Sequence, residues 1–174
     1  MAGAIEDYSD ECWAFALRIY HVPEVAPACL RLQSLAGVDV MFMLAVIFAA
    51  TQKNIVLTSS DVRELDEICG HWRERVVAPL RAVRTALKSD NPLSISKQAS
   101  ALRESIKVNE LRSERIQNDL IASILQPRER ISPRISAAQL AECLVTTIAH
   151  FKRSADADVS AEIIILQRVA LSLM

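Results

Sequence analysis

Glycine and aromatic residues are scarce in this chain, and their scarcity restricts the fold classes open to it. Only 3 Gly occur among the 174 residues, whereas folds rich in β-strands need many glycines in their turns. Aromatic residues make up 5% of the chain although 51% of it is hydrophobic, so the core must be aliphatic. Ala, Leu, Arg, Glu and Ile dominate, which favours helices. The sequence therefore predicts an all-α protein.

A strong charge imbalance and a membrane-length apolar run are also absent. The chain has 20 basic and 21 acidic residues and a net charge of −1, which gives no general attraction to nucleic acid or to an anionic membrane. Its acidic N-terminus lacks the basic and then apolar pattern of a secretory signal. The most apolar run, residues 38–50, is shorter than the roughly 20 residues that span a bilayer. We expect a cytoplasmic protein with no membrane span and no nucleic-acid partner.

The motifs of common active sites are missing too. The sequence contains no CxxC pair, no GxSxG motif and no glycine-rich phosphate loop, which are signatures of zinc sites, serine hydrolases and nucleotide sites. The four cysteines lie far apart, and we expect them to be reduced and buried. The three histidines are interpreted as structural or surface residues: His21, His71 and His150.

We therefore predict no metal, no cofactor and no catalytic residues. An enzyme is a lower-ranked alternative. It would require a cleft that joins His71 or His21 to a cysteine and a carboxylate.

One stretch is apolar on every side. Residues 37–50 read GVDVMFMLAVIFAA. Asp39 is the predicted N-cap of the helix in this run, and Gln52 follows the run and closes it. A helix that is hydrophobic all round belongs inside a core. We predict a bundle of about six or seven helices around a buried central helix at residues 39–52.

Apolar residues at helical spacing predict the surrounding helices. The first helix, about residues 9–20, is capped by Ser9 or Asp10. Its inward face consists of Trp13, Ala16, Leu17 and Tyr20 and is widened by Phe15 and Ile19. A helix at residues 72–88 contains Pro79, which predicts a kink or a break near that residue. The same periodicity predicts two helices near the C-terminus, which we expect to form a helical hairpin.

A long amphipathic helix is predicted at residues 94–125. Its narrow stripe is typical of a coiled-coil seam. The stripe consists of Ala99, Leu102, Ile106, Asn109, Ser113, Ile116, Leu120 and Ile124. Asn109 and Ser113 are either buried in the seam, where an Asn can fix its register, or face solvent, which is the favoured interpretation.

The sequence SDNP at residues 89–92 predicts a boundary. Residues 1–90 then form an N-terminal bundle. Residues 91–174 form a helical extension that packs on this bundle or on a second subunit. High hydropathy with few aromatics suggests apolar surface beyond a single core, which subunit interfaces commonly use.

Polar and amphipathic residues flank the central helix and suggest a ligand site. The candidates are Trp13, Arg31, Asp39 and Trp72, since bundles bind ligands between helices with a few polar groups aimed inward. Simpler roles are an N-cap for Asp39 and a surface position for Arg31. The arginines of residues 73–84 are interpreted as a solvated face or a docking patch rather than as a nucleic-acid surface.

Residues 8–88 resemble a known family. The similarity lies in WAFALRIYHVPEVAPACLRLQSLAGVDVMFMLAVIFA and WRERVVAPLRAVRTALK, with matching features at Trp13, Tyr20, Pro23, Cys29, Gly37, Asp39, Trp72, Arg73, Pro79, Arg81 and Arg84. These features resemble a proteobacterial family of short helical proteins known as a domain of unknown function. The resemblance implies a cytoplasmic bacterial α-protein and supplies no catalytic residues.

Together these observations predict a non-enzymatic interaction or adaptor protein that forms a homodimer. The alternative is a protein that binds a small apolar ligand in a pocket near Trp13, Asp39 and Trp72.

Overall fold

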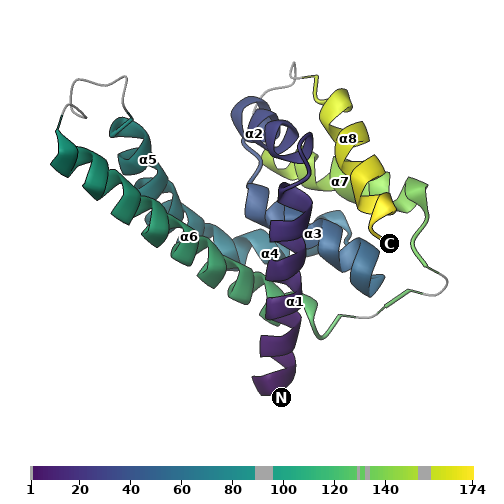
Figure 1. Ribbon diagram of the computed structural model, residues 1–174. Helices are drawn as coiled ribbons and strands as arrows, with labels where there is room; N and C mark the ends of the chain where they lie inside the picture. Colours follow the sequence, from purple (N-terminus) through teal and green to yellow (C-terminus); the bar gives the residue numbers. More distant parts are fainter. Residues whose placement is uncertain (1, 89–95, 129, 132–133, 153–157) are drawn as a thin grey trace.

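The computed structural model describes residues 2–88, 96–128, 130–131, 134–152 and 158–174, and this part of the chain is all-α (Figure 1). With α4, η1 and α5 taken as one continuous helix, the described residues form seven helices, as predicted. The elements are α1 (Ala2–Tyr20), α2 (Val25–Ala36), α3 (Val40–Lys53), α4 (Ser59–Trp72), the π-helix η1 (Arg73–Val77), α5 (Ala78–Ala86), α6 (Lys97–Leu125), α7 (Ala137–Phe151) and α8 (Ser160–Ser172).

Helix α3 is the central element, and its prediction is confirmed. Every residue from Met41 to Thr51 is buried, and the surrounding helices α1, α2, α6, α7 and α8 all contact it. Asp39 caps the helix, since its side chain accepts a hydrogen bond from the Phe42 amide at 3.1 Å. Asn54 ends it in the left-handed conformation, with φ 55°. The helix whose sequence is apolar on every side therefore lies in the middle of the core.

Helix α1 begins earlier than predicted. It starts at Ala2, so the expected caps Ser9 and Asp10 lie within the helix. Ser9 is buried, and its carbonyl and hydroxyl both accept from the Asn118 side chain of α6. The apparent cap is thus a tertiary contact. Of the predicted inward face, Phe15, Ala16 and Ile19 are buried, whereas Leu17 is 40% exposed.

Pro79 produces a widened turn rather than a break. The chain continues from α4 through η1 into α5, and the Ala78 amide bonds to the Arg73 carbonyl five residues earlier. Proline has no amide hydrogen, and its ring crowds the carbonyl four residues before it. A π-turn just ahead of Pro79 accommodates both effects without ending the helix.

Helix α6 packs on α1, α3, α4 and α5 of its own chain. Its stripe differs from the predicted seam: Leu102 and Ile116 are 53% and 44% exposed, whereas Glu110, Gln117 and Asn118 are buried. Asn109 faces solvent, as favoured, but Ser113 is buried and its hydroxyl donates to the Glu110 carbonyl at 2.7 Å. The helix begins at Lys97, capped by Ser96, while residues 94–95 lie outside the described ranges. The predicted boundary at residues 89–92 also falls outside them.

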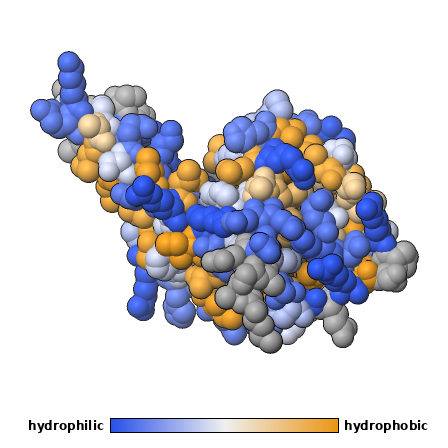
Figure 2. All heavy atoms as spheres, turned by 60° about the horizontal axis from the view of Figure 1, so that its bottom comes forward, coloured by the Kyte–Doolittle hydropathy of each residue, from blue (hydrophilic) through white to orange (hydrophobic). Residues whose placement is uncertain are grey.

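The distal part of α6 and helix α5 form an antiparallel arm. The arm stands away from the rest of the molecule in Figures 1 and 2, and no residue of α5 is buried. The remainder, which we call the body, contains one hydrophobic core to which α1, α2, α3, α4, α6, α7 and α8 all contribute. The predicted C-terminal hairpin is α7 and α8, which pack on each other, on α3 and on α2. Across the described ranges, no helix combines the length and apolarity needed to cross a membrane.

Candidate functional site

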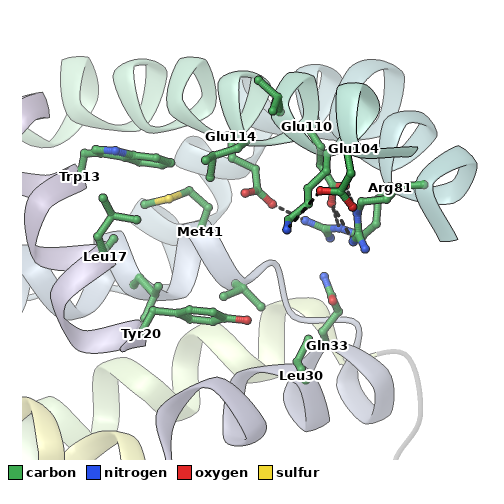
Figure 3. Close-up of a pocket in the computed structure, with 17 residues that line it drawn as sticks. Trp13, Leu17, Tyr20, Leu30, Gln33, Met41, Arg81, Glu104, Glu110 and Glu114 are labelled. Carbon is green, nitrogen blue, oxygen red and sulfur yellow. Dashed lines mark hydrogen bonds and ion pairs between the residues drawn. The ribbon is translucent and has the colours of Figure 1, made fainter. Parts of the chain in front are cut away.

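A groove separates the arm from the body (Figures 2 and 3). Helices α1, α2 and α3 line the body side, and α5 and α6 line the arm side; the volume is about 480 Å³. Its apolar lining consists of Trp13, Ala16, Leu17, Leu30, Val40, Met41, Leu44, Val108 and Leu111. Its polar lining consists of Tyr20, Gln33, Arg81, Arg84, Glu104, Lys107, Glu110 and Glu114. We call it the arm–body groove.

Exposed apolar side chains gather in this groove. Eleven large hydrophobic residues are exposed among the described residues, and four of them line it. These four are Leu17, Leu30, Val108 and Leu111. Single exposed hydrophobics scattered over a protein surface are normal, so the shared groove is what distinguishes these four from the other seven.

Ion pairs occupy the other end of the groove. Arg81 donates to Glu110 at 2.9 Å and to Glu114 at 2.6 Å, and Arg84 donates to both carboxylate oxygens of Glu110. Burial raises the pKa of Glu110, but the hydrogen bonds from Arg84 and Arg81 outweigh burial and hold that pKa below its usual value. For Glu114, burial dominates and raises the pKa, although Arg81 opposes the shift. The arginines thus serve as a docking patch for α6.

The four predicted ligand-binding residues are not gathered in one cavity. Trp13 lines the arm–body groove. Asp39 is buried and accepts from the Gln117 amide, while the Trp72 indole donates to the Ser113 carbonyl at 2.9 Å, so both meet α6 one turn apart. Arg31 points elsewhere and pairs with Glu162 of α8. Ligand binding by this set stays a prediction.

The residues of α6 on the arm side of the groove were not predicted from the sequence. Val108 and Leu111 fall outside the predicted stripe of the long helix and were therefore not treated as part of a site. The sequence did contain a signal for them. Val108 and Leu111 are apolar residues three positions apart, and they share one helix face outside the main stripe. Their partners on α1 and α2 come from distant parts of the chain, which periodicity within one helix does not reveal.

A histidine, a carboxylate and a cysteine also lie near one another, at Asp66. His150 Nε2 is 2.8 Å from Asp66, which also accepts from Arg73. Cys69 lies nearby but is fully buried, and burial, followed by the charges of Asp39 and Asp66, raises its pKa to about 12. A buried thiol with so high a pKa is a poor nucleophile. In the described part of the chain, no group of three or more His, Cys, Asp or Glu side chains could hold a metal ion.

The side of α6 that faces away from the groove carries a single charged residue, Arg112. At about 100° per residue, Leu102 lies half a turn around the helix from Leu111 of the groove. The α6 back face consists of Gln98, Leu102, Ser105, Asn109, Arg112, Ile116, Leu120 and Ser123, and only Arg112 among these is charged, although α6 carries nine charged residues. A face meant only for solvent normally carries charges.

Comparison with known proteins assigns a family. No curated protein and no solved structure matches the chain. A family model described as "Protein of unknown function (DUF2390)" matches residues 11–121. This range extends beyond residues 8–88, where the resemblance was recognised, and it contains every residue that lines the arm–body groove. The match covers well over half of the sequence, and the chain belongs to this family of unknown function.

Proposed function

We propose that the protein is a non-enzymatic interaction module that works as a homodimer, in which two copies pair through the α6 back face. The observation that carries the proposal is the row Leu102, Asn109 and Ile116. These three residues are exposed and lie seven positions apart. Apolar residues at this spacing form the seam of paired helices, and a polar Asn within a seam selects its register.

The spacing of this row favours a second copy as the partner. Leu102 and Ile116 lie seven positions before and after Asn109, so the row has the same apolar–polar–apolar pattern in both directions. Two antiparallel α6 helices crossing at Asn109 would place Leu102 against Ile116 of the partner subunit, and the reverse. A twofold interface requires such a self-complementary surface. The small net charge of −1 adds little repulsion between copies.

A charge placed in the row provides the test. We expect wild-type protein to sediment as a dimer at micromolar concentrations and Ile116→Glu to sediment as a monomer. Burying an unpaired carboxylate at an interface costs several kcal/mol, so the dissociation constant should rise at least tenfold. Ile164→Glu is the matched control, because Ile164 is an equally apolar side chain on α8 and is 61% exposed. A monomeric wild type, or equal dissociation in both variants, would overturn the proposal.

Engineered cysteines test the direction of pairing. When Leu102→Cys and Ile116→Cys proteins are mixed and mildly oxidised, antiparallel helices give a disulfide between the two variants. Parallel helices would instead join each variant to itself, which contradicts the arrangement. The native cysteines are buried and free, so background crosslinking should be low. Lys107→Cys, on the groove side of α6, is the control and should stay uncrosslinked.

We place this dimer in the cytoplasm. The four free cysteines support a reducing compartment, since proteins of oxidising compartments commonly pair theirs.

A further inference from the structure

The charged groups in the arm–body groove already have partners within the protein. Arg81, Arg84 and Glu110 form one cluster with Glu114, and Lys107 lies 3.7 Å from Glu104. These six side chains carry three positive and three negative charges, which balance. A charged group bound beside Glu110, whose side chain is 7% exposed, would have to displace an arginine pair or remain uncompensated, and both are unfavourable away from water.

Two uncharged polar groups of the groove remain available. Among the described residues, neither the Tyr20 hydroxyl nor the Gln33 side-chain amide makes a hydrogen bond, and both residues line the groove. Figure 3 shows the hydroxyl end of Tyr20 directed toward the side where Gln33 and Arg81 lie. Together they offer donors and acceptors to an uncharged polar group.

The opposite end of the groove is apolar. Figure 3 shows Trp13, Leu17 and Met41 gathered there, away from Arg81 and Glu110. Met41 is 7% exposed and forms part of the floor, and methionine adapts its shape to flexible apolar partners. The volume of about 480 Å³ lies within the usual range for small-molecule sites.

We propose that the arm–body groove binds a single-chain amphiphile with an uncharged polar head. The alkyl or acyl chain lies along Trp13, Leu17 and Met41, and the head bonds to Tyr20 and Gln33. This site goes beyond the proposed dimer and does not depend on it, because it occupies the opposite side of α6 from the back face.

Alkyl maltosides below their micelle concentrations are suitable probes. Trp13 and Trp72 are the only two tryptophans, so Trp13 fluorescence reports on the groove, and Trp13→Phe should remove the change. We expect saturable binding that tightens about fourfold for each added methylene from octyl to decyl to dodecyl maltoside. Dodecyl sulfate and dodecyltrimethylammonium should bind more weakly than dodecyl maltoside.

Variants locate the chain and the head. Leu17→Glu, at a 40% exposed position, should abolish saturable binding, whereas Ile164→Glu should leave it intact. Tyr20→Phe combined with Gln33→Leu should weaken maltoside binding at every chain length and preserve the increase per methylene. Tighter binding of either charged probe would contradict the uncharged head.

Two results would overturn the site itself. One is binding that does not saturate or that survives Leu17→Glu, which indicates a general hydrophobic surface. The other is dissociation of a dimer by Leu17→Glu, which would mean that a second copy occupies the groove. Failure of the dimer is recognised separately, by a monomeric wild type that still binds maltoside.

Discussion

Single residues in this protein owe their roles to partners from distant parts of the chain. Asp39 is an N-cap that sequence analysis identified, yet the Gln117 amide and, at 3.5 Å, the Arg73 guanidinium also approach its carboxylate. These contacts explain how a carboxylate with 7% side-chain exposure is tolerated in the body, since buried charges need pairing and hydrogen bonds. Glu114 is the opposite case, because burial prevails over its single arginine partner.

The raised pKa of Glu114 predicts a pH dependence of stability. Its ordinary pKa is 4.5, and burial raises the value in the folded protein. The folded state therefore holds this proton more tightly than the unfolded state, so the stabilisation is complete below pH 4.5 and is lost as pH rises through the folded pKa. Glu114→Gln stays neutral throughout and lacks this loss.

Urea unfolding over a range of pH checks this. The free energy of unfolding of wild type minus that of Glu114→Gln should fall as pH rises above 4.5 and then level off. A difference that grows with pH would show that the ion pair with Arg81 prevails over burial.

At the scale of elements, the arm depends on ion pairs more than on apolar burial. No residue of α5 is buried, and its arginines reach across to Glu110, whose side chain is 7% exposed. Charge-assisted hydrogen bonds are stronger than neutral ones, but the partly exposed arginines reduce their net contribution. Helix α5 should therefore be among the less stable parts of the fold.

Removing Glu110 should loosen α5. We expect Glu110→Ala to speed amide hydrogen exchange across α5 about tenfold, a local loss of roughly 1.4 kcal/mol, with little change in α3. Glu104→Ala is the matched control on the same helix, where the glutamate side chain is 60% exposed. Equal protection of α5 in both variants would show that apolar contacts hold the arm.

At the scale of the whole molecule, the body is packed around a single hydrophobic core. The core joins α1–α4 to α7 and α8, which lie outside the family match at residues 11–121. Leu144 of α7 is fully buried in this core, whereas its neighbour Val145 is 51% exposed. Both tryptophans lie before residue 90, so their fluorescence reports on the predicted N-terminal part.

This arrangement predicts a coupled transition. Leu144→Ala should lower the free energy of unfolding by about 2–5 kcal/mol, and it should shift the tryptophan fluorescence transition together with the circular dichroism transition. Val145→Ala should shift neither appreciably. A fluorescence transition unmoved by Leu144→Ala would show that the part around the tryptophans unfolds independently of α7.

The sequence by itself determined the secondary structure and the centre of the fold. Helix formation follows from local composition and periodicity, and the run at residues 40–50 is apolar on all sides, so only a central position buries it. The ends of elements were less predictable: Ser9 has the chemistry of a cap, yet it is buried against Asn118.

The tertiary structure decided which side of each amphipathic helix faces inward. Periodicity placed Leu102 and Ile116 of α6 inside, whereas the folded helix buries Glu110, which pairs with two arginines, and Gln117, which donates to Asp39. Such pairs join residues far apart in sequence, and their energy exists only once both partners are in place. For that reason the arm–body groove and the α6 back face emerged only from the folded structure.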